Sequence, residues 1–238
     1  MKFAGDKKVG QSFLTSLENR LVEKILPLVP LWLETYHLTL LTIVWSLLIL
    51  LFSYIGSLVN NINWLWLVSL MIAFQYLTDL IDGKVGKQRN TGLIKWGYYM
   101  DHFLDYFFLA SIIIGYLFIM PKVVYQTDVI ILNFFTLTWE VNYYYLMFFV
   151  FAILVGFMVN SFLSFAATNE FKIAYAGIGP TEVRIIFIAI NTLLIIFGKS
   201  YLGWALPYVL AVTLMGLIYT TYKTQKRLWK IDMKLRNE

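Results

Sequence analysis

Four aspartates stand in two closely spaced pairs in the sequence. Asp79 and Asp82 are three residues apart, and Asp101 and Asp105 are four residues apart. On an α-helix either spacing places both side chains on one face. Two carboxylates about 5 Å apart repel each other by about 3 kcal/mol at an effective dielectric constant of about 20. Four carboxylates that converge must therefore take up protons, pair with basic side chains or bind cations.

Divalent cations satisfy such a concentration of negative charge best. Ligation by carboxylate oxygens alone favours Mg²⁺ or Mn²⁺ over Zn²⁺, and one or two such ions match the charge of the four aspartates. The alternative to a metal site is a helix end at which the aspartates form salt bridges or are solvated. The basic residues that could form those salt bridges are equally suited to bind a phosphate: Lys84, Lys87, Arg89 and Lys95.

Glycines lie beside the first aspartate pair. Gly83 directly follows Asp82, and Gly86 lies three residues further along. Glycine allows a ligand to approach the backbone closely, although Gly86 is equally compatible with a helix end or a turn. Acidic side chains, glycines and basic residues together indicate a diphosphate that is held by metal ions.

The elements that must carry these residues are those of a membrane protein. Of the 238 residues, 60% are apolar and 14% are charged, whereas soluble domains contain about 25% charged residues. A hydrocarbon core of about 30 Å requires about 20 helical residues, and lipid admits only helices or closed barrels. Six apolar stretches are long enough and lack the alternation of barrel strands: residues 38–59, 62–82, 96–120, 143–167, 181–198 and 202–222.

We therefore expect an all-α, polytopic membrane protein with six transmembrane helices in a single domain, residues 1–238. The aspartate pairs lie at the end of the second stretch and at the start of the third, and residues 83–100 connect these stretches. Because this connection is short, the two helix ends stay adjacent. The four carboxylates can then converge in a water-filled cavity just inside the membrane, where charged side chains are tolerated.

The basic residues indicate the orientation. If the N-terminus is cytoplasmic, all of the 19 lysines and arginines except Lys122 and Lys199 fall on the cytoplasmic side, as the positive-inside rule requires. We expect an integral multi-pass protein of the cell or inner membrane, with both termini and the active site facing the cytoplasm. The net charge of +5 then favours an anionic membrane surface as a partner over nucleic acid.

Two flanking segments complete the chain. In the cytoplasmic segment 1–36, five apolar residues lie on one helical face: Leu14, Leu17, Leu21, Ile25 and Leu28. This pattern predicts an interfacial amphipathic helix before the six-helix bundle, residues 37–222. Residues 223–238 form a basic cytoplasmic tail, and we interpret both flanking segments as membrane-surface anchors.

The absence of cysteine excludes a disulfide framework, a thiolate metal site and a cysteine nucleophile.

The aspartate pairs and their glycines resemble the motif of the CDP-alcohol phosphatidyltransferase family, which places the same chemistry on the second and third of six membrane helices. That motif reads D-x-x-D-G-x-x-A-R-x8-G-x-x-x-D-x-x-x-D. All four acids and two of the glycines match it in order: Asp79, Asp82, Gly83, Gly97, Asp101 and Asp105.

This chain departs from the motif in three places. Gly86 stands where the family has alanine, Lys87 stands where the family has arginine, and one extra residue precedes Gly97. A lysine lacks the planar fork with which arginine binds a phosphate. Because of the extra residue, Arg89 could take the phosphate-binding role in place of Lys87.

The resemblance implies a transferase of phospholipid biosynthesis. Such an enzyme transfers a substituted phosphate group from a CDP-alcohol to an acceptor alcohol and releases CMP. One of the two alcohols is lipidic, and the family suggests a homodimer among membrane lipids. The resemblance also implies two divalent ions, Mg²⁺ or Mn²⁺, that are bound by Asp79, Asp82, Asp101 and Asp105. Asp105 would in addition accept the proton of the attacking hydroxyl as the catalytic base.

The resemblance further implies a set of substrate contacts. Gly83, Gly86 and either Lys87 or Arg89 would lie beside the diphosphate. The family often has Asn-x-x-Thr at the start of the first span, and here a tyrosine replaces the asparagine, so we transfer only Thr39 as a substrate contact.

Two further residues have open roles. Arg184 follows Glu182 at the start of the fifth span, and the two either cap the helix or Arg184 contacts the phosphate or headgroup of the acceptor. His102 follows Asp101, as in the choline and ethanolamine branch of the family. We interpret His102 as a structural or dimer-facing residue, with a substrate contact as the alternative.

Two other classes of function also use carboxylates in a membrane. An intramembrane prenyltransferase acts on a polyprenyl diphosphate through Asp-rich motifs, but it normally has more spans and lacks the Asp–Gly pair. A cation transporter uses buried carboxylates, but here the acids lie at one membrane face and not at the midplane. We keep both classes as alternatives to the CDP-alcohol reaction.

Overall fold

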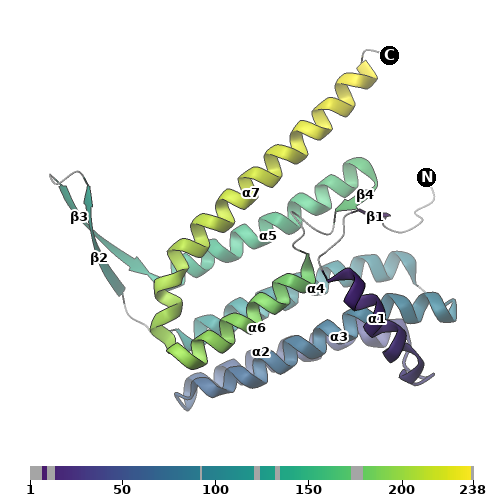
Figure 1. Ribbon diagram of the computed structural model, residues 1–238, viewed down its shortest axis with the longest axis horizontal. Coiled ribbons are helices and arrows are strands. Elements are labelled where there is room, and N and C mark those ends of the chain that lie inside the picture. The colour runs from purple at the N-terminus through teal and green to yellow at the C-terminus, as the bar shows by residue number, and fades with distance from the viewer. Residues whose placement is uncertain are drawn as a thin grey trace.

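The computed structural model describes residues 7–9, 14–91, 93–120, 124–131, 135–172 and 179–236. These residues form a helical bundle with two small two-stranded sheets (Figure 1). The α-helices are α1 (Thr15–Ile25), α2 (Thr35–Leu58), α3 (Leu65–Arg89), α4 (Ile94–Ile119), α5 (Tyr143–Thr168), α6 (Pro180–Phe197) and α7 (Lys199–Arg236). Two short 3₁₀ helices, η1 (Leu26–Leu28) and η2 (Ile62–Trp64), precede α2 and α3.

The strands lie at the edges of the bundle (Figure 1). β1 (Lys7–Val9) pairs in parallel with β4 (Glu170–Lys172), which follows α5. β2 (Val124–Ile131) and β3 (Phe135–Asn142) form an antiparallel hairpin between α4 and α5. The hairpin projects from the end of the bundle that is opposite to α1 (Figure 1).

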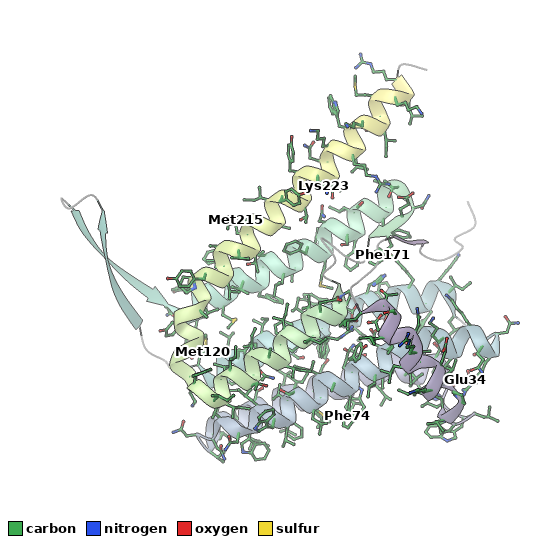
Figure 2. All side chains as sticks on the ribbon, in the orientation of Figure 1. Glu34, Phe74, Met120, Phe171, Met215 and Lys223 are labelled. Atoms are coloured by element: carbon green, nitrogen blue, oxygen red, sulfur yellow. The ribbon has the colours of Figure 1, made fainter. Side chains whose placement is uncertain are left out.

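The six predicted spans are present. Six helical segments among the described residues, within η2 and α2 to α7, are long and apolar enough to cross a membrane. The prediction of an all-α membrane protein with six membrane helices is therefore confirmed. Large apolar side chains such as Phe74 and Met215 are exposed on the outside of the helices (Figure 2), as expected where lipid is the solvent.

The connection between the aspartate pairs is shorter than predicted. α3 continues well past Asp82, and only residues 90–93 separate it from α4, so most of residues 83–100 are helical. Asn90 ends α3 in the left-handed conformation, with a φ of 54°, and its N–H caps two carbonyls of the last turn. The basic residues of that turn suit the negative end of the helix dipole, which favours the continuation of the helix through its glycines.

All six membrane helices contribute buried side chains to the core, and four of them meet at its centre. α2 packs against both α3 and α4, and α6 packs against α3. Each of these four helices contributes a fully buried side chain at the centre of the bundle: Ile49, Ile72, Ile112 and Leu194. α5 and α7 pack against each other, beside this group (Figure 1).

The amphipathic helix α1 is docked on the bundle. It lies where the sequence predicted an interfacial helix, and its Val22 is buried. A second, smaller core joins the segment after α1 to the start of α2 and the end of α3, through Leu38, Ile81 and Val85. Part of the N-terminal segment therefore packs on protein at the end of the bundle that carries Asp82, whereas Leu17 and Leu28 of the predicted apolar face are exposed.

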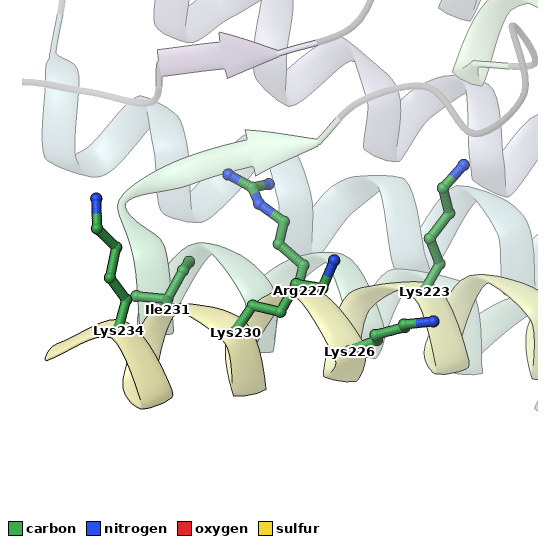
Figure 3. A pocket seen from close by; sticks show the side chains of 6 residues that line it. All are labelled: Lys223, Lys226, Arg227, Lys230, Ile231 and Lys234. Carbon is green, nitrogen blue, oxygen red and sulfur yellow. The ribbon is translucent and has the colours of Figure 1, made fainter. Parts of the chain in front are cut away.

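The sixth span and the basic tail form one continuous helix. α7 contains 38 residues, about 57 Å of helix at 1.5 Å per residue, whereas the hydrocarbon core is about 30 Å thick. The last turns of α7 carry a row of basic side chains (Figure 3): Lys223, Lys226, Arg227, Lys230 and Lys234. The end of α7 and α1 lie at the same end of the molecule (Figure 1).

Candidate active site

The start of α2 holds the second aspartate of the first pair. Asp82 accepts a hydrogen bond on its carboxylate Oδ2 from Thr39 Oγ1 at 2.7 Å, and one on its backbone carbonyl from Thr35 Oγ1 at 2.8 Å. Both threonines are buried, whereas Asp82 is half-buried. Thr39, which the resemblance predicts as a substrate contact, is thus a direct partner of Asp82.

Arg184 of α6 joins the two aspartate pairs. Its Nη2 lies 3.0 Å from Asp79 Oδ2 of α3 and 3.3 Å from Asp105 Oδ1 of α4. Its Nε donates to Gln75 Oε1 at 2.7 Å, and its guanidinium carbon lies 5.8 Å from the centroid of the Phe108 ring. Arg184 is only 5% exposed, and an unpaired guanidinium at such a position would cost several kcal/mol. These contacts therefore hold α6 against both α3 and α4.

The aspartates that pair with Arg184 are only partly buried. The side chain of Asp79 is 25% exposed and that of Asp105 is 28% exposed, so water and ions can reach both carboxylates. Asp101 lies one turn before Asp105 on α4. Two of the four predicted aspartates thus contact the same basic side chain.

The start of α6 brings Arg184 to this position. The Gly179 N–H donates to Glu182 Oε2 at 2.8 Å, which caps the helix. Thr181 Oγ1 donates to Glu18 Oε1 of α1, so the N-terminal helix is tied to the same turn. Glu182 is therefore the capping residue, whereas the side chain of Arg184 reaches the aspartates, a pairing that was not predicted from the sequence.

Space is available beside the first aspartate pair. A Cβ atom added at Gly83 would have no neighbour within 4 Å, and the same holds at Gly97. Gly83 is exposed, whereas Gly86 is buried and its carbonyl accepts the N–H of Thr91 at 3.1 Å. Gly83 thus leaves room for a ligand next to Asp82, and Gly86 contributes to the end of α3.

The two basic residues predicted to bind phosphate differ in their surroundings. The guanidinium of Arg89 donates to four backbone carbonyls between α1 and α2, at 2.8 to 3.3 Å: Val29, Pro30, Leu31 and Leu33. Lys87 is exposed on the last turn of α3. Arg89 therefore fixes the connection between α1 and α2, while the charge of Lys87 faces solvent.

His102 packs within an aromatic cluster. Its ring stacks on Phe171 of β4 and meets Tyr98 of α4 edge-on, with centroid distances of 4.5 Å in both cases. Phe162 of α5 lies 5.3 Å away. This environment joins α4 to α5 and β4, and it favours the structural interpretation of His102 over a substrate contact.

The donor set fits a divalent ion in its chemistry, although the structure does not bring all four carboxylates together. Within the described ranges, no three His, Cys, Asp or Glu side chains are close enough to bind one metal ion jointly. The aspartates nevertheless offer only carboxylate oxygens, the ligands that Mg²⁺ and Mn²⁺ prefer. A cationic guanidinium already lies between Asp79 and Asp105, so these two carboxylates are within reach of a shared cation.

Three residues beside the aspartates were not expected from the sequence. Gln75 lies four residues before Asp79, and Thr35 lies four residues before Thr39. Such spacing places each of them on the same helix face as its neighbour, which is a signal that could have indicated them. Glu18 lies on α1, and its hydrogen bond with Thr181 of α6 is a tertiary contact that no local sequence pattern predicts.

The fold and the acid pairs define a membrane-embedded enzyme, and sequence comparison gives its class. The family profile described as CDP-alcohol phosphatidyltransferase matches residues 35–219, most of the chain from the start of α2 into α7. The chain therefore belongs to the CDP-alcohol phosphatidyltransferase family, as the aspartate motif predicted. No curated protein sequence matches the chain.

Family membership establishes the general reaction. The protein is a transferase that moves a phosphoalcohol group from a CDP-alcohol. The family as a whole depends on divalent metal ions. This result favours the CDP-alcohol reaction over the prenyltransferase and transporter alternatives.

We expect Arg89→Gln to destabilise the protein and Lys87→Gln to leave its stability unchanged. Replacement of Arg89 removes the charged donor of four backbone carbonyls, and the loss of hydrogen bonds from a charged group costs about 2 kcal/mol. Lys87 is exposed, where a charge contributes little to stability. Thermal unfolding of the two detergent-solubilised variants measures the difference, and equal midpoints would contradict the structural role of Arg89.

Proposed function

We propose that the chain catalyses the metal-dependent transfer of a substituted phosphate group from a CDP-alcohol to an acceptor alcohol, with release of CMP, in phospholipid biosynthesis. One of the two alcohols carries lipid chains. The observation that carries this proposal is that Arg184 contacts one aspartate of each pair, Asp79 on α3 and Asp105 on α4. Acids from two separate helices thus share one cation position at the end of the membrane spans.

The four aspartates supply the ligands for two Mg²⁺ or Mn²⁺ ions in this proposal. Asp79, Asp82 and Asp101 hold the ions, and Asp105 can serve as an additional ligand. When bound, such ions neutralise the diphosphate and the charge that develops on the departing oxygen of CMP. The hydrogen bond from Thr39 orients the carboxylate of Asp82, so Thr39 acts on the substrate through that aspartate.

Residues at the end of α3 receive the phosphates of the donor. Gly83 provides the space next to Asp82, and Gly86, three residues further along, adds no side chain to this part of the helix. Lys87 is exposed and contributes its positive charge to the phosphates. Arg89 is engaged with backbone carbonyls, so we assign the phosphate contact to Lys87 and a positioning role to Arg89.

Asp105 is the proposed general base. The hydroxyl oxygen of the acceptor forms a bond to the phosphorus that carries the donor alcohol, and the bond from this phosphorus to the bridging oxygen of CMP breaks. The hydroxyl proton passes to the carboxylate of Asp105, and CMP leaves with the bonding electron pair. The side chain of Asp105 is 28% exposed, which leaves it accessible to an incoming hydroxyl.

The location of the site suits a lipid substrate. The aspartates lie at the end of the bundle that also carries α1 and the basic turns of α7. We propose that this end faces the cytoplasm in the cell or inner membrane, because anionic lipid headgroups attract a row of lysines and arginines. A homodimer is the expected assembly, as the family resemblance implies.

Release of CMP tests this function directly. Purified protein with Mg²⁺ is incubated with CDP-diacylglycerol and glycerol phosphate, inositol phosphate or serine, and separately with CDP-choline or CDP-ethanolamine and diacylglycerol. We expect acceptor-dependent formation of CMP from one donor, and its loss when EDTA removes the divalent ion. Release of pyrophosphate from a polyprenyl diphosphate, without CMP from any donor, would contradict the proposal and support a prenyltransferase.

We expect Asp105→Asn to retain the fold and to lose most of the turnover. Asparagine cannot accept the hydroxyl proton, and general-base assistance contributes roughly 10²- to 10⁴-fold to a rate. Asp79 still pairs with Arg184 in this variant, so the buried guanidinium keeps an anionic partner. The rate of CMP release is compared with that of Asp232→Asn, a control at an exposed position of α7. Turnover like that of the wild type would refute the assignment of the base.

A further inference from the structure

The guanidinium of Arg184 stands between carboxylates that the proposed function assigns to metal ions. Its Nη2 is shared between Asp79 Oδ2 at 3.0 Å and Asp105 Oδ1 at 3.3 Å. A divalent ion held by the same two carboxylates would compete with Nη2 for their oxygens, so the two cations would exclude each other.

Electrostatics explains why an arginine is placed here. Carboxylates about 5 Å apart repel each other by about 3 kcal/mol, and a basic side chain among them lowers that repulsion when no ion is bound. Arg184 is 5% exposed, so water screens its charge weakly and its acidic partners must offset the cost of its burial. The aspartates and Arg184 therefore stabilise each other.

Gln75 holds Arg184 in this position. Its Oε1 accepts the hydrogen bond from Nε of Arg184 at 2.7 Å, and the residue is fully buried. Its amide nitrogen has no hydrogen-bond partner among the described residues. An unpaired buried donor costs free energy of folding. The contribution of Gln75 at this position is therefore its hydrogen bond to Arg184. Its removal would weaken the hold on Arg184 without changing any charge.

We propose that Arg184 is a built-in cation, which neutralises Asp79 and Asp105 while no ion is bound and which divalent ions displace. This inference rests on the proposed function, because that function supplies the ions. Once displaced, the guanidinium is available to a phosphate of the substrate, whose oxygens match its planar fork. The same side chain would then couple ion loading to substrate binding, because it exchanges carboxylate partners for a phosphate.

The test measures the affinity of the protein for Mn²⁺ in the absence of any nucleotide. It is measured by electron paramagnetic resonance of free Mn²⁺ with the full-length, detergent-solubilised protein. We expect Arg184→Gln to bind Mn²⁺ about tenfold more tightly than the wild type, the size of a typical coupling between two sites, because no internal cation competes. Arg184→Lys keeps the charge but loses the fork, and its affinity should fall between the two.

Two further variants complete the test. Gln75→Met keeps every charge and frees Arg184 from its hydrogen bond, so it should raise the affinity about threefold, a smaller coupling of the same kind. Arg227→Gln removes an exposed ion pair with Glu170, away from the aspartates, and should match the wild type. If Arg184→Gln does not fold without ions, Gln75→Met and Arg184→Lys decide the result.

The possible results separate this inference from the proposed function. Mn²⁺ binding that is unchanged or weaker in the Arg184 and Gln75 variants would overturn the displacement of Arg184 and would leave the metal site intact. If neither the wild type nor any variant took up Mn²⁺, the metal site of the proposed function would itself be contradicted, and the displacement with it.

Discussion

The ion pairs of one buried arginine with an aspartate of each acid pair are the interaction on which the rest of the structure depends. A charged side chain within the membrane is costly, and like charges at short range repel each other. One buried guanidinium offsets part of the burial cost and part of the repulsion, because Arg184 of α6 contacts Asp79 of α3 and Asp105 of α4. Charge pairing thus ties three helices together at this end.

Other polar contacts arrange the surrounding elements about that pairing. Threonines of α2 hold Asp82, Arg89 fixes the link between α1 and α2, and Glu18 of α1 accepts a hydrogen bond from the start of α6. Apolar contacts specify helix positions weakly in a membrane, because lipid is as apolar as the side chains. Directional hydrogen bonds and ion pairs therefore specify how the helices are placed. A buried network deeper in the bundle joins α3, α4 and α6 in the same way: Ser69, Tyr116 and Asn191.

The range of each interaction decides how much of this structure can be predicted from the sequence. The six spans and the acid pairs are predictable because hydropathy and helical spacing are local properties. The helical continuation after Asp82 is not, since its glycines indicate a loop and only the basic last turn and the Asn90 cap show why α3 persists. The contact between Arg184 and the aspartates cannot be predicted either, because Arg184 lies 79 positions from Asp105 in the sequence. By spacing alone Lys87 and Arg89 are better candidates, yet the guanidinium of Arg89 is bound to backbone carbonyls.

The central claim is that the aspartates bind a nucleotide through divalent ions, and calorimetry tests it most directly. CDP-alcohols are titrated into the purified wild-type protein in Mg²⁺, in Mn²⁺ and in EDTA, and then into the Asp79→Asn/Asp101→Asn double variant under the same conditions. The account predicts a heat of binding for at least one CDP-alcohol with either ion, none in EDTA, and none with the double variant. Binding of equal strength in EDTA, or no binding of any cytidine compound in the presence of ions, would contradict it.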